Sequence, residues 1–349
     1  MNAINLKYKV WPILVIALFV TPAEAEEVDS DSLQLGTKAV SIDRTAPRYP
    51  AVELRRGRQG WVELSYVVTK DGNVVDPIVQ DSSGSSYFEK AATEIVEDWL
   101  YEPATWNGKA IQQCENKVLI TFAVEDAGKE VTLSYANKHK KISKELEEGN
   151  LEKARELIDK QFESKNLTLP ELSWLWSLEA HYAGLVGDKQ AQLAAVKRAT
   201  ISNGRWVTDD LYPSLLLIQT IRELELGNYS AAFRSHEKLL ETKAEYPQLD
   251  VIQDNIERLQ AVVASDATYA VPAQISEDKW SYSLLRNRFS LAQVNGDLGN
   301  LEIRCARNRV VDEARMGTSW EIPENWGACS VIVFGSSGTT FNLLEQPDA

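Results

Sequence analysis

The clearest structural signal in the sequence is Gly60-Trp61-Val62-Glu63-Leu64-Ser65-Tyr66-Val67-Val68, which alternates like a β-strand. The turn signal Asp71-Gly72-Asn73 follows, and Val74-Val75-Asp76-Pro77-Ile78-Val79 resumes an extended pattern. Two strand patterns that are joined by such a turn are typical of a β-hairpin. The sequence therefore predicts a hairpin over residues 60–79.

A helix is expected directly after this hairpin. Asp81-Ser82-Ser83-Gly84 breaks the strand pattern, and Ser86 with Glu89 three residues later indicates a capping box. One face of the expected helix is apolar, and it carries Phe88, Ala91, Ala92, Ile95, Val96 and Trp99. We expect the helix to end before Pro103.

A last strand completes this first pattern. Asn107-Gly108 turns the chain, and Lys117-Val118-Leu119-Ile120-Thr121-Phe122-Ala123-Val124 is rich in strand-forming residues. The predicted order is β-β-α-β, which is a small antiparallel sheet with one helix on a face.

A helical period follows between about residues 137 and 265, where a short motif recurs. Each copy starts with Gly-Asn or Gly-Asp and has a small residue a few positions later: Gly149-Asn150-Leu151-Glu152-Lys153-Ala154, Gly187-Asp188-Lys189-Gln190-Ala191 and Gly227-Asn228-Tyr229-Ser230-Ala231-Ala232. The glycine supplies a tight turn and the small residue lets two helices approach. The motif therefore predicts stacked α-helical hairpin repeats, in a pattern that resembles degenerate tetratricopeptide repeats.

Short strands and turns fill residues 275–345 and predict a small all-β domain. Asn295-Gly296-Asp297 is a hairpin signal, Leu301-Glu302-Ile303-Arg304-Cys305 alternates, and Ser330-Val331-Ile332-Val333-Phe334-Gly335 is an apolar strand. A region of roughly 70 residues makes a thin core. A disulfide that closes a loop of this size would stabilise it by about 3–4 kcal/mol.

The chain has three cysteines from which such a disulfide could form. Cys305 and Cys329 lie in the same small region, so we expect them to pair and Cys114 to be left over. Other pairings, or three buried free thiols, are the alternatives. The expected fold class is thus multidomain α+β, ending in a small disulfide-stapled β domain.

The first 25 residues indicate export from the cytoplasm. Lys7 and Lys9 precede the apolar run of residues 10–20, and Ala23-Glu24-Ala25 has the small-x-small pattern of a signal cleavage site. The run spans eleven residues, whereas a membrane-crossing helix needs about 20. We expect cleavage after Ala25, a leader over residues 26–44 and a periplasmic protein. A retained single-pass anchor in the inner membrane, facing the periplasm, is the alternative.

The formal net charge of −14 excludes some partner classes. Such an acidic surface repels phosphate groups, so nucleic acid and anionic membranes are poor partners. Plain solubility also explains such a charge. Membrane contact is expected only if the N-terminal segment is retained.

No catalytic motif stands out. The histidines His139, His181 and His236 are far apart in the sequence, and we expect His181 to be packed in an apolar helix. No G-x-S-x-G, phosphate-loop or paired-cysteine metal motif occurs. The sequence therefore predicts neither an enzyme nor a cofactor or metal site.

Residues 45–124 resemble the C-terminal domain of the TonB family. The matching pieces run in order along the chain: Pro47-Arg48-Tyr49-Pro50, Gly60-Trp61-Val62-Glu63-Leu64, Asp71-Gly72-Asn73-Val74, Asp81-Ser82-Ser83-Gly84, Phe88-Glu89-Lys90-Ala91-Ala92, Trp99-Leu100-Tyr101-Glu102-Pro103-Ala104, Asn107-Gly108-Lys109 and Val118-Leu119-Ile120-Thr121-Phe122. The resemblance places a TonB-like domain at residues 45–125.

This resemblance implies protein binding. Domains of the family bind an extended segment of an outer-membrane receptor by adding it as a strand to a sheet edge. By similarity, the recognising strand is Lys117-Val118-Leu119-Ile120-Thr121-Phe122-Ala123-Val124, with the turn at Asn107 and Gly108 beside it. The expected partners are therefore outer-membrane receptors or other envelope proteins. Simple packing of the strand's side chains within the sheet is the alternative.

Two departures from the family separate the functional alternatives. Full transducers keep a membrane helix and a long proline-rich spacer, whereas residues 26–45 contain no proline. The leading hypothesis is a periplasmic adaptor associated with TonB-dependent transport, with the helical repeats as a second protein-binding surface. A membrane-anchored energy transducer is the alternative, and a structural envelope or cell-wall binding module with a covered sheet edge is a second one.

The N-terminus of the natural protein tests the first of these choices. We expect mass spectrometry to find a mature chain that starts at Glu26, because the apolar run is too short to span a membrane. An uncleaved start at Met1 would instead favour the anchored transducer.

Overall fold

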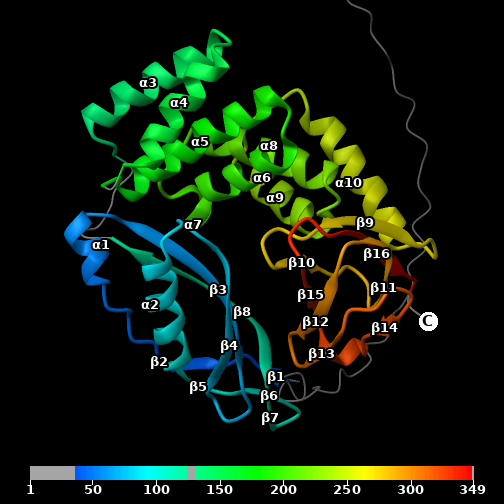
Figure 1. Cartoon of the computed structure of the whole chain (residues 1–349). Coiled ribbons are helices and arrows are strands. Elements are labelled where there is room, and N and C mark those ends of the chain that lie inside the picture. The colour runs from blue at the N-terminus through cyan, green and yellow to red at the C-terminus, as the bar shows by residue number, and fades with distance from the viewer. Residues whose placement is uncertain (1–35, 124–129, 165, 348–349) are drawn as a thin grey trace, which may run out of the picture. The chain divides into compact units, whose positions relative to one another are not determined.

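The computed structural model describes residues 36–123, 130–164 and 166–347 (Figure 1). The expected signal segment, its cleavage site at Ala25 and residues 26–35 of the leader lie outside the described residues. A first β region (residues 36–123) is followed by a helical region (residues 132–263) and a second β region (residues 269–346). The predicted α+β class, with strands, helices and strands in that order, is confirmed.

The first β region is built on a three-stranded antiparallel sheet with the order β4-β3-β8. Helix α2 packs on one face of this sheet through Phe88, Ala92 and Val96 (Figure 1). The predicted β-β-α-β order is found in β3, β4, α2 and β8. The elements of the region are β1 (Gly36–Thr37), β2 (Val40–Asp43), α1 (Ala51–Arg56), β3 (Gly60–Val68), β4 (Val74–Ser82), α2 (Ser86–Glu97), β5 (Leu100–Glu102), β6 (Ala104–Trp106), β7 (Lys109–Ile111) and β8 (Gln113–Phe122).

The start of helix α2 corrects the predicted capping box. Its N-cap is Ser85, and the Ser85 side chain makes no capping hydrogen bond. Its hydroxyl instead donates to Glu53 at 2.9 Å. Glu89 accepts a hydrogen bond from the Ser82 hydroxyl. A buried carboxylate at Glu53 needs donors, so this tertiary contact replaces the local motif.

The end of helix α2 also lies earlier than predicted. The helix stops at Glu97, and Leu100–Glu102 forms strand β5, which pairs with β2. Strand β1 pairs with β6, and β7 completes that sheet. Residues 36–43, which the sequence analysis assigned to the leader, therefore form two strands of the fold.

The helical region contains the three predicted turns. Gly149, Gly187 and Gly227 have φ values of 73°, 80° and 74° and join α3 to α4, α5 to α6 and α8 to α9. The tetratricopeptide resemblance itself stays a prediction. The helices are α3 (Leu133–Glu147), α4 (Leu151–Phe162), α5 (Leu169–Val186), α6 (Lys189–Ala199), α7 (Ile201–Gly204), α8 (Leu211–Glu225), α9 (Tyr229–Glu241) and α10 (Leu249–Val263).

The second β region consists of two four-stranded sheets with the orders β10-β15-β12-β13 and β14-β11-β16-β9. Side chains of both sheets share one core, to which Phe289, Leu301, Val331 and Leu343 contribute. Its elements are β9 (Tyr269–Gln274), β10 (Lys279–Ser283), β11 (Arg288–Asn295), β12 (Leu298–Cys305), β13 (Arg309–Glu313), β14 (Ser319–Glu321), η2 (Glu324–Trp326), β15 (Cys329–Gly335) and β16 (Thr340–Gln346).

The Asn295-Gly296-Asp297 hairpin prediction is wrong. This turn joins β11 to β12, and these two strands belong to different sheets because β11 pairs with β14 and β16. The predicted disulfide is present. Cys305 and Cys329 are register partners on the neighbouring strands β12 and β15, and their sulfurs are bonded.

Hydrogen bonds from Arg286 connect the second β region to the end of the helical region. Arg286 lies between β10 and β11 and is 6% exposed. Its guanidinium donates hydrogen bonds to the carbonyl oxygens of Val262 (2.7 Å), Val263 (3.0 Å), Ser265 (2.6 Å) and Ala267 (2.7 Å). These carbonyls lie at and beyond the end of α10, where helical N–H groups no longer reach them.

No helix within residues 36–123, 130–164 and 166–347 is both long and apolar enough to cross a membrane.

Partly buried His139 makes the stability of the helical region sensitive to acid. Its ring packs against Trp174 with 5.0 Å between centroids, and burial lowers the pKa of its imidazole to about 4. An unfolded histidine has a pKa of about 6.5. The contribution of neutral His139 to the free energy of unfolding is therefore fully present above about pH 6.5. It is lost as the pH drops toward 4, because the unfolded state then binds more protons than the folded state.

We expect His139→Gln to flatten the decrease in unfolding midpoint between pH 6.5 and pH 4, as measured by circular dichroism in urea. His181→Gln is the matched control because His181 is exposed on α5. An equal slope in the wild-type chain and His139→Gln would contradict this assignment.

Candidate protein-binding edge

Strand β8 lies at one side of its sheet. In the order β4-β3-β8, strand β3 is central, and no second strand of the described residues pairs with β8. The residues predicted to recognise a partner, Lys117, Val118, Leu119, Ile120, Thr121 and Phe122, all lie on this strand, whereas Val124 lies outside the described residues. An edge strand presents backbone donors and acceptors that can pair with another chain.

The register identifies which backbone groups face outward. Ser83 donates its N–H to the carbonyl oxygen of Trp61 at 2.9 Å, so the backbone of Trp61 faces β4. Trp61 is the register partner of Thr121. In an antiparallel pair the hydrogen-bonded positions alternate, so Thr121 and Leu119 turn their N–H and C=O groups away from β3.

The side chains of β8 alternate between two faces. Ile120 and Phe122 are 6% and 2% exposed and pack toward α2. The Phe122 ring stacks on Phe88 with 4.4 Å between centroids, and Tyr49 meets both rings edge-on. Lys117 and Thr121 lie on the opposite face and are exposed. We call this second face, away from α2, the open face.

Asn107 and Gly108 do not lie on this sheet. Their φ values of 50° and 72° form the tight turn between β6 and β7, which belong to the sheet β1-β6-β7. Positive φ at both turn positions is typical of a two-residue hairpin. The structure therefore separates this turn from the sheet of β8, although β7 immediately precedes β8 in the chain.

The helical region covers one end of the open face. Trp61 is 1% exposed and packs with Leu169 and Trp206, while Leu119 is partly buried against the same cluster. Nearby, Arg198 of α6 donates to both carboxylate oxygens of Asp81 at 2.9–3.2 Å.

The second β region covers the other end through a buried charge network. Arg304 donates to Glu302 at 2.6 Å, to the Ser65 hydroxyl at 3.3 Å and to the carbonyl oxygen of Asp76 at 3.1 Å. Arg309 binds both Glu302 and the Asp76 carboxylate. The side chains of Arg304 and Glu302 are 3% and 5% exposed.

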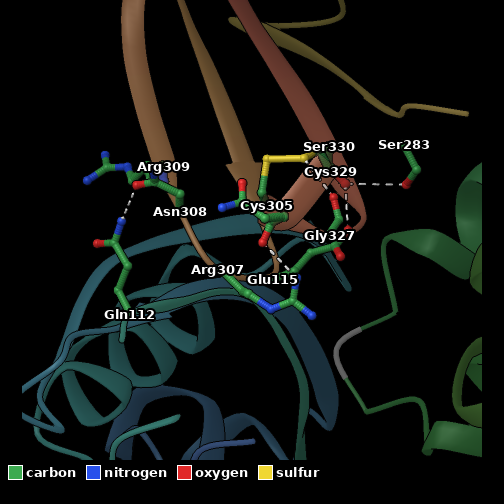
Figure 2. Close-up of a disulfide and its surroundings, with 11 residues drawn as sticks. Gln112, Glu115, Ser283, Cys305, Arg307, Asn308, Arg309, Gly327, Cys329 and Ser330 are labelled. Carbon is green, nitrogen blue, oxygen red and sulfur yellow. Dashed lines mark hydrogen bonds between the residues drawn. A yellow bond between two sulfur atoms is a disulfide. The ribbon is translucent and has the colours of Figure 1, made fainter. Parts of the chain in front are cut away.

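Two polar contacts lie beside this network. Ser330 donates its hydroxyl to Glu115 at 2.8 Å, and Gln112 donates its amide to Asn308 at 2.9 Å. Figure 2 shows Glu115 and Gln112 beside the strand ends that carry the Cys305–Cys329 disulfide. The disulfide thus stabilises the end of the second β region that contacts β8.

The sheet therefore has one face covered by α2, an open face covered at both ends, and outward-facing backbone groups on β8. No hydrogen bond between described residues ends on the backbone of Leu119 or Thr121 from outside the sheet.

The segment that contains this sheet is similar to a known protein family. Residues 45–124 match the family model of the Gram-negative bacterial TonB protein C-terminal. The TonB resemblance of this segment is thereby confirmed.

The similar curated proteins each match less than a quarter of this chain. Protein tonB2 of Pseudomonas aeruginosa is 40% identical over 69 residues, which are 20% of this chain and 26% of that protein. Protein TonB of the same organism is 29% identical over 79 residues, which are 23% of each chain. The chain thus spans about a quarter of the length of these curated relatives.

Two solved structures are also similar. The solution NMR structure of the Pseudomonas aeruginosa TonB CTD is 25% identical, covers 29% of this chain and 94% of its own, and has a TM-score of 0.23. The tonb2 protein of Vibrio anguillarum is 29% identical, covers 32% of this chain and 99% of its own, and has a TM-score of 0.22.

Two further kinds of site could lie among the described residues: metal-binding clusters and nucleophilic side chains. Among the described residues, no group of three or more His, Cys, Asp or Glu side chains is placed to hold a metal ion. Burial raises the pKa of the free Cys114 thiol to about 12, so it stays protonated and is a poor nucleophile. His181, which was expected to be packed, is exposed.

The residues that cover the TonB-like sheet were missed by sequence reasoning. Asp81 and Arg198 are 117 positions apart, and Ser65 and Arg304 are 239 positions apart. No local period or spacing links residues at such distances. The charged residues Glu302 and Arg304 inside the strand pattern 301–305 were the available signal. A charge on a strand either faces solvent or, where the strand is covered, needs a partner.

Removing Arg304 tests the buried network. We expect Arg304→Ala to lower the free energy of unfolding by about 3 kcal/mol, because the substitution leaves Glu302 with one cation fewer in a buried site. Arg315→Ala is the matched control, since its pair with Glu313 is 66% and 60% exposed and such surface pairs contribute little to stability. Urea unfolding measures both, and equal losses would show that the network is not important for stability.

Proposed function

We propose that this protein binds another envelope protein by adding an extended segment of that partner as a strand to β8, in association with TonB-dependent transport. An outer-membrane receptor is the first candidate partner. The observation that carries the proposal is the outward-facing backbone of Leu119 and Thr121 on an edge strand of a TonB-like sheet. Strand addition draws its affinity from backbone hydrogen bonds, and such groups are what it requires.

The proposed role is non-catalytic. Strand addition forms and breaks no covalent bond, and the TonB-like segment needs no cofactor for it. The Cys305–Cys329 disulfide agrees with an oxidising compartment such as the periplasm.

The length of the spacer favours a free periplasmic binder over an anchored transducer. Strand β1 begins at Gly36, so in an uncleaved chain residues 21–35 are all that separates the apolar run of residues 10–20 from the first strand. A spacer of this length, fully extended, reaches at most about 50 Å. A chain held at the inner membrane by so short a spacer would be poorly suited to reach an outer-membrane receptor.

The register selects a clean test at Thr121. Ile120 is buried and pairs with Val62 through the ladder, so a proline there would also damage the sheet. Thr121 is exposed, and its N–H faces outward. We expect Thr121→Pro to abolish capture of envelope proteins by the purified chain, while Thr121→Val keeps it.

The measurement is affinity capture from an envelope extract of the protein's own cells, with the captured proteins identified by mass spectrometry. The unfolding midpoint of Thr121→Pro controls for damage to the fold. Capture of the same proteins by wild type and Thr121→Pro would contradict strand addition at β8.

A further inference from the structure

A large cavity lies beside the edge strand. Its volume is about 1200 Å³, and residues of all three regions line it. Strand β8 contributes Cys114, Glu115, Asn116, Lys117 and Leu119, and of these Lys117 and Leu119 lie on the open face beside the outward-facing backbone groups. The helical region contributes residues of α6 and α9, and the second β region contributes residues of β10 and β15.

Four cations that line this cavity have no carboxylate partner within the part of the chain that the structure describes. They are Lys117 of β8, Lys197 of α6, and Arg234 and Lys238 of α9, all exposed. Arg234 donates to the Ser230 hydroxyl at 2.7 Å, and Lys238 donates to the Asn203 side chain at 2.8 Å. None of the ion pairs between described residues includes any of the four. In a chain with a net charge of −14, such a group of unpaired cations is unexpected.

The carboxylates of the cavity wall are arranged differently. Asp81 is neutralised by Arg198, while Glu115 and Glu89 accept the hydroxyls of Ser330 and Ser82. Glu223 of α8 is 1% exposed and accepts hydrogen bonds from Gln219 and Ser235. Glu63 lies on the central strand β3, one strand farther from the edge than Lys117. Glu277 and Asp278 are exposed in the turn before β10. The cations of the cavity wall that have no ion pair among the described residues therefore lie on α6, α9 and the edge strand.

The Arg198–Asp81 pair already shows how this wall holds a carboxylate. Arg198 binds both oxygens of Asp81, and its guanidinium lies over the Trp176 ring at 4.7 Å from the centroid. Bidentate charge-assisted bonds of this kind are among the strongest that proteins make to a carboxylate. Arg234 of α9 can bind a further carboxylate in this bidentate way, whereas Lys197 and Lys238 can each bind one through a single ammonium group.

We propose that the cavity selects partners whose added strand carries Asp or Glu at alternate positions. This inference rests on the proposed strand addition at β8. Side chains of an added strand alternate between the two faces of the sheet, so every second one points to the same side as Lys117 and Leu119. Those side chains enter the cavity, where Lys117, Lys197, Arg234 and Lys238 attract negative charge. The backbone of β8 supplies affinity and the cavity supplies sequence preference.

The test uses a displayed library of random octapeptides, selected on the purified full chain. We expect the enriched peptides to carry Asp or Glu at every second position. A synthetic copy of one enriched peptide should bind at least 10-fold more weakly to the double variant Lys197→Glu/Lys238→Glu. Lys160→Glu is the matched control, because Lys160 is exposed on α4 and does not line the cavity. It should change the dissociation constant by less than twofold.

The outcomes separate this inference from the function on which it rests. Enriched peptides that lack acidic residues, but that Thr121→Pro no longer binds, overturn the cavity's selectivity and leave strand addition standing. Acidic peptides that Thr121→Pro still binds overturn strand addition at β8 and, with it, this inference. No enrichment on the wild-type chain contradicts the proposed binding function itself.

Discussion

The antiparallel pairing of β3 with β8 is the constraint on which the rest of the first β region depends. Its register sets Val62 opposite Ile120 and Trp61 opposite Thr121. Alternate residues therefore face α2 or the open face, and a slip of one residue would exchange the two sets. The same pairing leaves the backbone of Leu119 and Thr121 turned outward. Core packing and the capacity to bind another strand thus follow from one register.

The two faces of this sheet are covered in different ways. Helix α2 covers one face with aromatic and aliphatic side chains, whereas the open face meets two regions through a Trp61 cluster and a buried charge network. Buried ion pairs add little net stability because both charges lose their hydration. They do penalise alternative packings, since moving Arg304 and Arg309 away from Ser65 and Asp76 breaks the hydrogen bonds and the ion pair that join the two β regions. The network therefore favours one arrangement of the contact.

Covering the open face also has a consequence for recognition. Strand addition through backbone atoms tolerates many sequences, so any preference has to come from side chains next to the edge. In an isolated sheet the open face of an added strand would meet water. Here the helical region and the second β region line that side with polar and charged groups. We interpret these polar and charged groups as the contacts that discriminate between the side chains of different segments bound to β8.

Local patterns in the sequence determined much of this architecture. Strand alternation over residues 60–68, glycine turns at 149, 187 and 227, and a pair of cysteines in one small region each have a short-range physical cause, and each was found as expected. The family resemblance of residues 45–124 identified the edge strand. Only the tertiary structure decided the rest: the cap of α2, the strands β1 and β2 in the leader, the sheet change at Asn295-Gly296-Asp297, and the cover of the open face. The reason is that buried polar groups such as Glu53 and Arg304 take partners from distant parts of the chain. A sequence records the residue that needs a partner, but the fold selects which one it meets.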